Sequence, residues 1–169
     1  MRAIRWIVVV GLLLASTSGL SAKELSPEET VTSYLNALKS QNFKEAYRYV
    51  SKSMANNKSE EEWAKEQQWV MQMTEAKIFE FKVYPAKLEG DKAYVPNVLS
   101  SQDKYLNQLG VEEQELYTLV REDGRWKIAQ QEIVERQDID KWFPKAPSGP
   151  PQAGRDEGMN LGDKGTSGR

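Results

Sequence analysis

The feature that most constrains the fold is the stretch Leu116–Val134, in which two strand-like runs flank the dipeptide Asp123-Gly124. An Asp-Gly pair between such runs is the strongest short-range indication of a β-hairpin, because the type I′ hairpin turn needs positive φ at both central positions. With this loop, Arg121 pairs with Trp126, and a cation–π contact between them contributes about 0.5–1 kcal/mol. The sequence therefore predicts an antiparallel sheet that ends on this hairpin.

The register of the hairpin divides its apolar side chains between two faces of the sheet. The face predicted to meet the core carries Tyr117, Leu119, Trp126 and Ile128. The opposite face is also apolar and carries Leu116, Val120, Ala129 and Ile133. We therefore expect both faces to be covered, the second either by another copy of the chain or by the segment Arg136–Phe143. The candidate interface residues on this second face are Leu116, Val120 and Ile133.

Three amphipathic helices are predicted ahead of the sheet. The first begins at a capping box, 26–29, with Pro27 at the first helical position, and runs to Leu38. The second begins at Asn42, which can cap it. The third begins at another capping box, 59–62, and continues to about residue 73.

Two strands follow the helices, joined by a turn at Gly90-Asp91. A two-residue loop there sets Pro85 opposite Pro96. Neither proline can donate a ladder hydrogen bond, so we expect the sheet to bend at this point. The polar stretch Ser100–Glu113 is predicted to be a long connection to the final hairpin.

The first 22 residues have the form of a secretory signal peptide. They contain a basic start, an apolar run over 7–15, and a small polar stretch ending Leu-Ser-Ala, which predicts cleavage after Ala22. The run is shorter than the roughly 20 residues of a membrane span, so no stable span is expected after cleavage, and an uncleaved anchor is the alternative. We therefore expect an exported protein, periplasmic or extracellular.

Residues 23–143 are predicted to form a single domain, followed by a disordered tail. The segment 144–169 contains four Pro and six Gly and few aliphatic residues. Such a segment cannot bury enough apolar surface to offset its ordering entropy. A docking role for its proline-rich part, 147–151, is the weaker alternative.

Composition excludes several kinds of chemistry. The chain has no Cys and no His, so lipid attachment at Cys, disulfides and the commonest general base and metal ligand are absent. Without the two Arg of the leader, 21 basic residues stand against 25 acidic ones, a net charge of about −4. This balance argues against nucleic acid and anionic membranes as partners. No cofactor and no metal are predicted.

The order of helices and strands resembles the nuclear-transport-factor-2-like superfamily, in particular its small exported bacterial members of unknown function. The resemblance covers about residues 26–135 and is carried by the segments 27–38 and 43–47 and by Asp123–Ile128. It implies an α+β, cystatin-like fold, in which helices pack on a bent antiparallel sheet shaped as a cone with a pocket at its open end. Isomerases and cyclases of the superfamily work from that pocket.

The pocket candidates are Tyr34, Trp69, Met73, Tyr94, Asn97 and Tyr117. An isomerase-type site needs a carboxylate base and a Tyr donor, and Asp91, Asp103 and Asp123 all fall in predicted turns or loops. We therefore predict no catalytic residues and expect a non-enzymatic binding or protein-interaction module. Its partner is predicted to be a small apolar ligand, an envelope protein or a second copy bound through the sheet. The alternatives are a small isomerase- or cyclase-type enzyme and a structural accessory of the envelope.

Overall fold

The structure is a computed structural model that describes residues 24–144. It is an α+β fold with the elements α1 (Pro27–Lys39), α2 (Phe43–Tyr47), α3 (Glu60–Thr74), β1 (Lys77–Val83), β2 (Lys87–Glu89), β3 (Lys92–Gln102), β4 (Glu112–Glu122), β5 (Arg125–Ile133), η1 (Arg136–Asp138) and α4 (Ile139–Trp142). The predicted leader, and all of the predicted tail except Pro144, lie outside the described residues. Among residues 24–144, no helix is long and apolar enough to cross a membrane.

The three helices begin where the sequence predicts. The Ser26 hydroxyl accepts a hydrogen bond from Glu29 N–H, and the Glu29 carboxylate accepts one from Ser26 N–H at 2.7 Å. Ser59 and Glu62 form the same reciprocal capping box at the start of α3. Asn42 caps α2 by accepting from the N–H of the third helical residue. These caps use donors that a helix start leaves without intrahelical partners.

The final hairpin has the predicted register. Arg121 pairs with Trp126, Leu119 pairs with Ile128, and the guanidinium of Arg121 lies 4.3 Å from the centre of the Trp126 ring. Beyond Leu119 the register shifts through a bulge at Ala129. The bulge moves every later side chain of β5 to the other face of the sheet.

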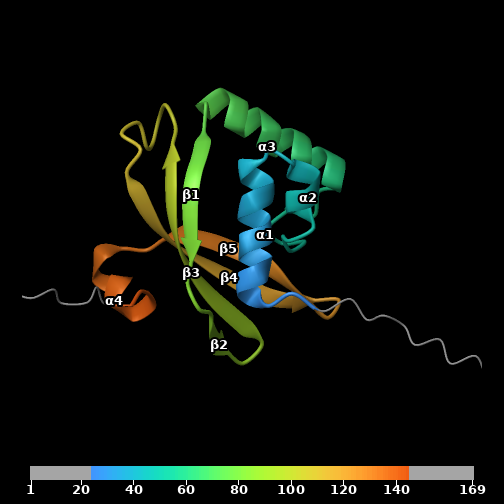
Figure 1. Cartoon of the computed structure of the whole chain (residues 1–169). Helices are drawn as coiled ribbons and strands as arrows, with labels where there is room; N and C mark the ends of the chain where they lie inside the picture. Colours follow the sequence, from blue (N-terminus) through green and yellow to red (C-terminus); the bar gives the residue numbers. More distant parts are fainter. Residues whose placement is uncertain (1–23, 145–169) are drawn as a thin grey trace, which may run out of the picture.

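The sheet has the order β1-β3-β4-β5, and β2 also pairs with β3. The pairing is interrupted between β1 and β2, where Pro85 lies, and Tyr84 N–H there donates to Pro96 O at 2.9 Å. Figure 1 shows the resulting bend, with the sheet curving around α1. β3 and β4 are longer than predicted, so the connection between them shortens to residues 103–111.

The core lies between α1 and the concave face of the sheet. It contains Val31, Tyr34 and Leu35 from α1 and, from the strands, Val95, Tyr117, Leu119 and Ile128. α1 packs on β1, β3 and β5, whereas α3 packs mainly on α2 and makes few contacts with the sheet. Trp63 is buried near the start of α3, but the second half of this helix projects away from the core.

The outer face of the sheet is covered in part by the chain's own C-terminal segment. Trp142 packs on Tyr94 at 5.3 Å between ring centres, and Phe143 packs on Tyr84 at 5.4 Å. Of the two covers predicted for this face, the structure has the segment that ends at Phe143. Leu116, one of the predicted interface residues on this face, is only 3% exposed, so it is already buried within the described chain.

Candidate functional site

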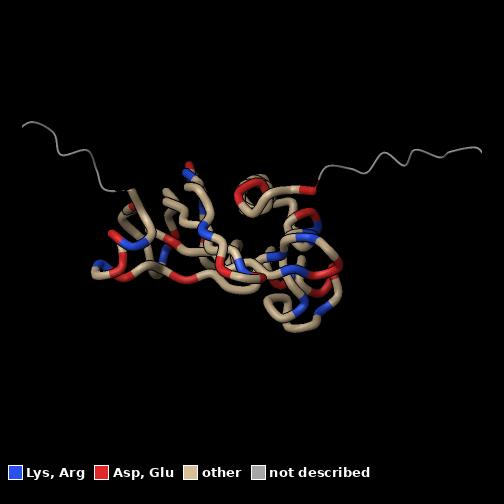
Figure 2. The backbone as a smooth tube through the Cα atoms, turned by 90° about the horizontal axis from the view of Figure 1, so that it is seen from below, with Lys and Arg blue, Asp and Glu red and all other residues tan. Residues whose placement is uncertain are grey.

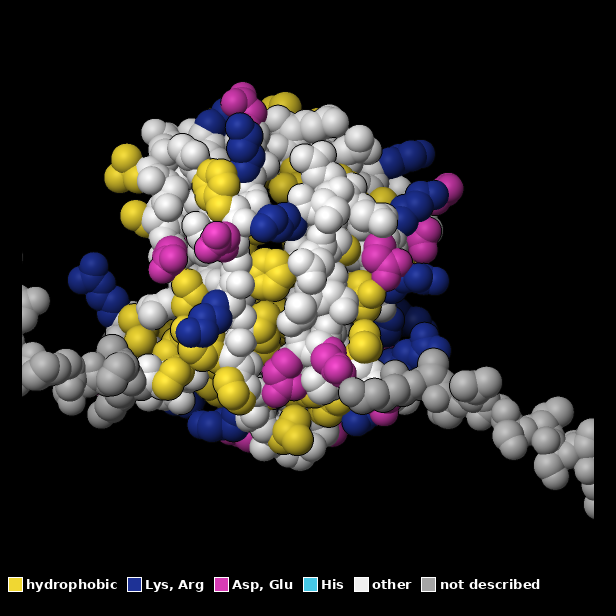
Figure 3. Space-filling model, viewed as in Figure 1, with side chains coloured by type: hydrophobic (Ala, Val, Ile, Leu, Met, Phe, Trp, Pro, Cys, Tyr) yellow, Lys and Arg dark blue, Asp and Glu magenta, His cyan; other side chains and the backbone are white. Residues whose placement is uncertain are grey.

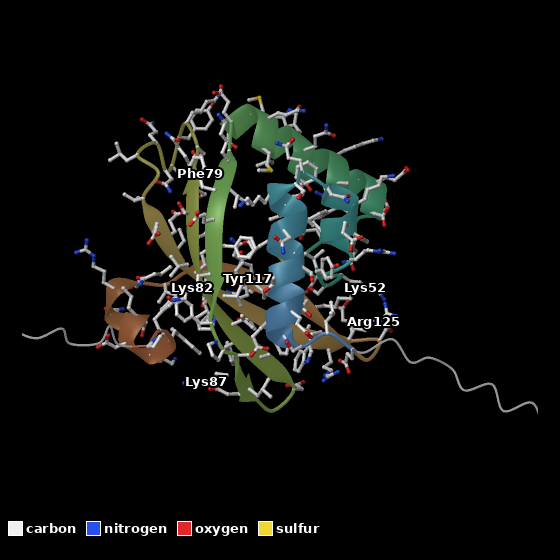
Figure 4. The ribbon with its side chains drawn as sticks, viewed as in Figure 1. Lys52, Phe79, Lys82, Lys87, Tyr117 and Arg125 are labelled. Atoms are coloured by element: carbon white, nitrogen blue, oxygen red, sulfur yellow. The ribbon has the colours of Figure 1, made fainter. Side chains whose placement is uncertain are left out.

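A buried carboxylate, Glu115, lies between α1 and the sheet. Its Oε2 accepts hydrogen bonds from the Asn97 amide and the Tyr117 hydroxyl, both at 3.0 Å, and its Oε1 accepts one from the Gln131 amide at 2.8 Å. The Tyr34 ring packs edge-on against Tyr117, with ring centres 6.1 Å apart. We name these five residues the Glu115 cluster. Figure 4 shows Tyr117 deep in the centre of the molecule.

Burial controls the acidity of this cluster. Loss of water raises the pKa of the Glu115 carboxyl above its ordinary value, and the donors Gln131, Asn97 and Tyr117 lower it in part. Burial and the nearby Glu115 charge raise the pKa of the Tyr34 and Tyr117 hydroxyls, so both stay protonated at neutral pH. The cluster therefore holds one weakened acid among neutral hydrogen-bond donors.

The centre of the Glu115 cluster is closed to solvent, whereas Gln131 at its edge is exposed. Asn97 and Tyr117 are fully buried, and Glu115 is 4% exposed. The Asn97 Oδ1 atom is buried without a hydrogen-bond partner, which is uncommon for a buried polar atom. Two hollows are found elsewhere on the surface, one of about 840 Å³ beside the β4–β5 hairpin and one of about 320 Å³ between α2 and α3. None of the cluster's residues lines either hollow.

The sequence analysis missed Glu115 and Gln131. Glu115 precedes Tyr117 by two positions, and strand alternation alone places both on the same face. Gln131 reaches that face only because of the bulge at Ala129, which pairs it with Tyr117. The same bulge pairs Ile133 with Glu115, so the prediction that Ile133 shares a face with Leu116 is wrong. Val120 lies on the outer face as expected and is partly exposed.

The six predicted pocket residues fall into three places. Tyr34, Asn97 and Tyr117 come together in the Glu115 cluster. Tyr94 lies on the outer face against Trp142, so its placement in a shared pocket was wrong, because residues 94 and 97 have opposite parity along one strand. The remaining two lie on α3 and are exposed, by 60% for Trp69 and 46% for Met73.

Exposed apolar side chains gather at one end of the molecule. Trp69 and Met73 lie one turn apart on α3, Phe79 follows in β1, and the β3–β4 loop presents Leu106 and Leu109, which are 93% and 89% exposed. We name these five residues the apolar end. Figure 1 shows the loop and the end of α3 at the same end of the fold, Figure 3 shows apolar side chains protruding there, and Figure 4 places Phe79 between them.

The two parts of the apolar end are joined directly. Lys104 N–H donates to Thr74 O at 3.0 Å, so the loop is bonded to the last residue of α3. The Lys104 ammonium also forms an ion pair with Glu75 at 3.1 Å. By the size of such side chains, the five residues of the apolar end together expose roughly 500 Å² of apolar surface.

The β3–β4 loop is ordered by buried polar contacts, although its leucines have no cover. Asn107 is 4% exposed; its amide donates to Ser101 O at 2.9 Å and Val111 O at 2.8 Å, and its Oδ1 accepts from Val111 N–H at 3.0 Å. The Asp103 carboxylate accepts three backbone N–H groups, of residues 105–107, which lower its pKa. The loop therefore presents its leucines from a fixed backbone.

Acidic residues border the apolar end. Glu80 and Glu112 both pair with Ser100, so the three lie in one row across β1, β3 and β4. Figure 2 shows acidic and basic residues dispersed along the backbone. In the part of the chain that the structure describes, no group of three or more acidic residues is placed to hold a metal ion.

No model of a known protein family matches the chain, and no curated protein matches it by sequence. Several solved structures are similar in fold. One is a SEC-C motif containing protein from Rhodopseudomonas palustris, with 16% identity, a TM-score of 0.49, and coverage of 65% of this chain and 80% of that one. A domain of unknown function with a cystatin-like fold from Nostoc punctiforme has 12% identity, a TM-score of 0.48, and coverage of 69% and 84%.

A third similar structure is an NTF2-like protein of unknown function from Cytophaga hutchinsonii. It has 14% identity and a TM-score of 0.40, and the match covers 66% of this chain and 90% of that one. At these identities and TM-scores the likeness concerns the fold alone and says nothing of function.

Proposed function

We propose that this protein is an exported, non-enzymatic protein-interaction module of the nuclear-transport-factor-2-like kind, and that it binds its partner through the apolar end. The observation that carries the proposal is the exposure of Leu106 and Leu109 to solvent. Both side chains are almost fully exposed, while Asn107 between them is buried and fully hydrogen-bonded. A fixed loop that holds two leucines in water is the form expected of a preformed contact surface.

The charges around this surface favour a protein partner over a lipid. Glu80 and Glu112 border the apolar end and have no ion pair within residues 24–144. Lys39, Lys77 and Lys104 also lie at this border. It therefore carries both signs of charge and lacks the uniformly basic rim that attracts anionic lipid headgroups. The partner is a protein surface with an apolar centre and charged residues of both signs at its edge.

The Glu115 cluster supports the enzymatic alternative less well. Its buried carboxylate and adjoining Tyr117 hydroxyl have the chemistry of an isomerase-type site. A general base must come within about 3 Å of the proton that it removes, and Asn97, Glu115 and Tyr117 are sealed from solvent. We therefore assign the cluster to the stability of the fold.

Site-specific photo-crosslinking in the source organism tests the proposal. The full chain carries p-benzoylphenylalanine in place of Leu106 and, as a matched control, in place of Leu88, which is 64% exposed on β2 at the opposite end. We expect one discrete protein adduct from position 106 and none from position 88. The adduct from 106 should disappear when Leu109→Asp is added, because a charge in the contact surface cannot be desolvated.

Three outcomes would overturn the proposal. They are the absence of an adduct at position 106, equal adducts at positions 106 and 88, and an adduct that survives Leu109→Asp. An adduct with twice the mass of the chain would identify the partner as a second copy, which supports a protein-interaction role. Crosslinking to lipid in place of protein would contradict the role proposed here.

A further inference from the structure

A groove of about 840 Å³ lies between the β4–β5 hairpin, the segment after α2 and the start of α1. Its lining includes three buried residues, Thr30, Val50 and Ser51. Ser51 N–H donates to Ile128 O, and Ile128 N–H donates to Tyr49 O, both at 2.8 Å. The two sides of the groove are therefore tied together by main-chain hydrogen bonds. We name this hollow the hairpin groove.

Three of the acidic side chains in the hairpin groove already have partners within the protein. Glu45 forms an ion pair with Arg48 at 2.9 Å. Glu24 pairs with Arg121. Glu122 accepts a backbone N–H from across the groove with both oxygens, at 3.2 and 3.3 Å. The two ion pairs offset the charges of Glu45 and Glu24, whereas Glu122 keeps its charge because a backbone N–H is neutral.

Two basic side chains of the hairpin groove have no partner in the described chain. Lys52 and Arg125 line it, and neither side chain has an ion pair or hydrogen bond among residues 24–144. Figure 4 shows both at the same edge of the molecule, beside the hairpin. Lys127 is partly buried and donates to Arg48 O. Burial, with the charges of Arg125 and Arg48 nearby, lowers the pKa of Lys127.

Two acidic residues of the lining remain without partners in the described chain, Glu60 and Asp123. Glu60 lies in the first turn of α3, where the helix dipole already offsets its charge. Asp123 lies in the hairpin turn at the rim. Glu122 also keeps its charge, so Lys52, Arg125 and Lys127 face an equal number of acids. Among these basic side chains only Lys52 and Arg125 have no partner in the described chain, and the Trp126 ring adds an aromatic wall to the groove.

We propose that the hairpin groove binds a small organic anion, with a carboxylate or phosphate group on an apolar or aromatic body. Lys52 and Arg125 bind the anionic group, since their ammonium and guanidinium groups donate several hydrogen bonds and Arg can bind both oxygens of such a group at once. The body of the ligand lies against Trp126. This site is separate from the apolar end, so it goes beyond the proposed function and does not depend on it.

An NMR titration of the ¹⁵N-labelled full chain tests this site, with phenyl phosphate, benzoate and inorganic phosphate as the probes. We expect saturable shifts at Arg125 and the Trp126 indole, with a dissociation constant of about 1 mM or lower for the better aromatic anion. Inorganic phosphate should bind about tenfold more weakly, because it lacks the body that contacts Trp126. The stronger of the two aromatic probes identifies the anionic group.

A pair of matched variants makes the test specific. Lys52→Ala with Arg125→Ala should weaken binding about tenfold or more, while Lys82→Ala with Lys87→Ala, exposed on β1 and β2, should leave it unchanged. All four side chains are exposed or rim residues, and the variants' spectra report whether the fold is retained. The absence of saturable shifts at about 10 mM probe, or equal weakening by both variants, would overturn the proposal.

Discussion

The Glu115 cluster and the apolar end reverse the usual distribution of side chains. A carboxylate with four polar or aromatic neighbours is sealed in the core, while Leu106 and Leu109 stand almost fully in water. Burial of the carboxylate is costly unless hydrogen bonds compensate it, and the three donors on Glu115 do so. Hydrogen bonds also act at the apolar end, where the contacts of Asn107 hold the loop that carries the leucines. In one region they satisfy the buried group itself, and in the other they fix the backbone that carries the exposed groups.

The difference indicates which region is structural and which is available to a partner. The three donors on Glu115 come from β3, β4 and β5, so they link these strands and satisfy both carboxylate oxygens. At the apolar end, the hydrogen bonds of Asn107 fix the loop backbone, and the leucine side chains of this loop point into solvent. Of the four changes that follow, the two at Glu115 should alter the stability of the fold more than the two at the apolar end.

The largest effect is expected from Glu115→Ala. It leaves the Asn97 amide and the Tyr117 hydroxyl buried without their acceptor, so we expect the free energy of unfolding to fall by about 3 kcal/mol. Urea denaturation monitored by circular dichroism measures this loss. Glu112→Ala, on the exposed outer face, is the control and should change stability by less than about 0.5 kcal/mol. If Glu115→Ala also lowered the free energy of unfolding by less than about 0.5 kcal/mol, the cluster would contribute little to stability.

Glu115→Gln should remove a pH dependence. Because the folded-state pKa of Glu115 is raised, the fold favours the protonated acid; this stability is complete below the ordinary value of 4.5 and is lost as pH rises through the folded pKa. The stability of the Gln variant relative to wild type should therefore increase as pH rises above about 4.5, by at most about 1.4 kcal/mol per pH unit. Denaturation midpoints at several pH values measure the difference. Parallel profiles would contradict the raised pKa.

Asn107→Ala should loosen the loop more than the domain. It removes three hydrogen bonds and leaves Val111 N–H without an acceptor, a loss of about 1–2 kcal/mol. Amide hydrogen exchange should show faster exchange within 103–111 and little change in β5. Uniformly faster exchange across the sheet would instead make Asn107 part of the global fold.

The smallest effect on stability is expected from Leu106→Ser with Leu109→Ser. Neither side chain is buried in the free protein, so the free energy of unfolding should change by less than about 0.5 kcal/mol. Leu119→Ser, fully buried in β4, is the contrasting variant and should cost about 3 kcal/mol or more. A clear loss from the exposed pair would mean that these leucines pack within the fold.

Much of the fold could be predicted because its determinants are local. Caps at Ser26 and Ser59 and the Asp123-Gly124 turn act through neighbouring residues, so they are readable in the sequence. The bulge at Ala129 is not, because no Gly or Pro marks it and it depends on how β5 meets the segment 49–51. That one inserted residue places Gln131 beside Glu115, so the donor set of the buried acid could not be predicted.

The candidate sites were less predictable than the fold. Strand parity alone separates Tyr94 from Asn97, and it would also have found Glu115 beside Tyr117. The exposure of Trp69 and Met73 depends on α3 leaving the sheet, which is a matter of tertiary packing and not of helical spacing. The apolar end joins α3 to the β3–β4 loop, two segments that are distant in the sequence.

The preformed state of the apolar end can be measured most directly by ¹⁵N backbone relaxation of residues 103–111 in the full chain. If the contacts of Asp103 and Asn107 fix the loop, the order parameters of residues 105–109 should be about 0.85, equal to those of β3 and β4. Order parameters below about 0.6 would contradict the account. The exposure of Leu106 and Leu109 would then reflect a mobile loop, and no contact surface would exist before a partner binds.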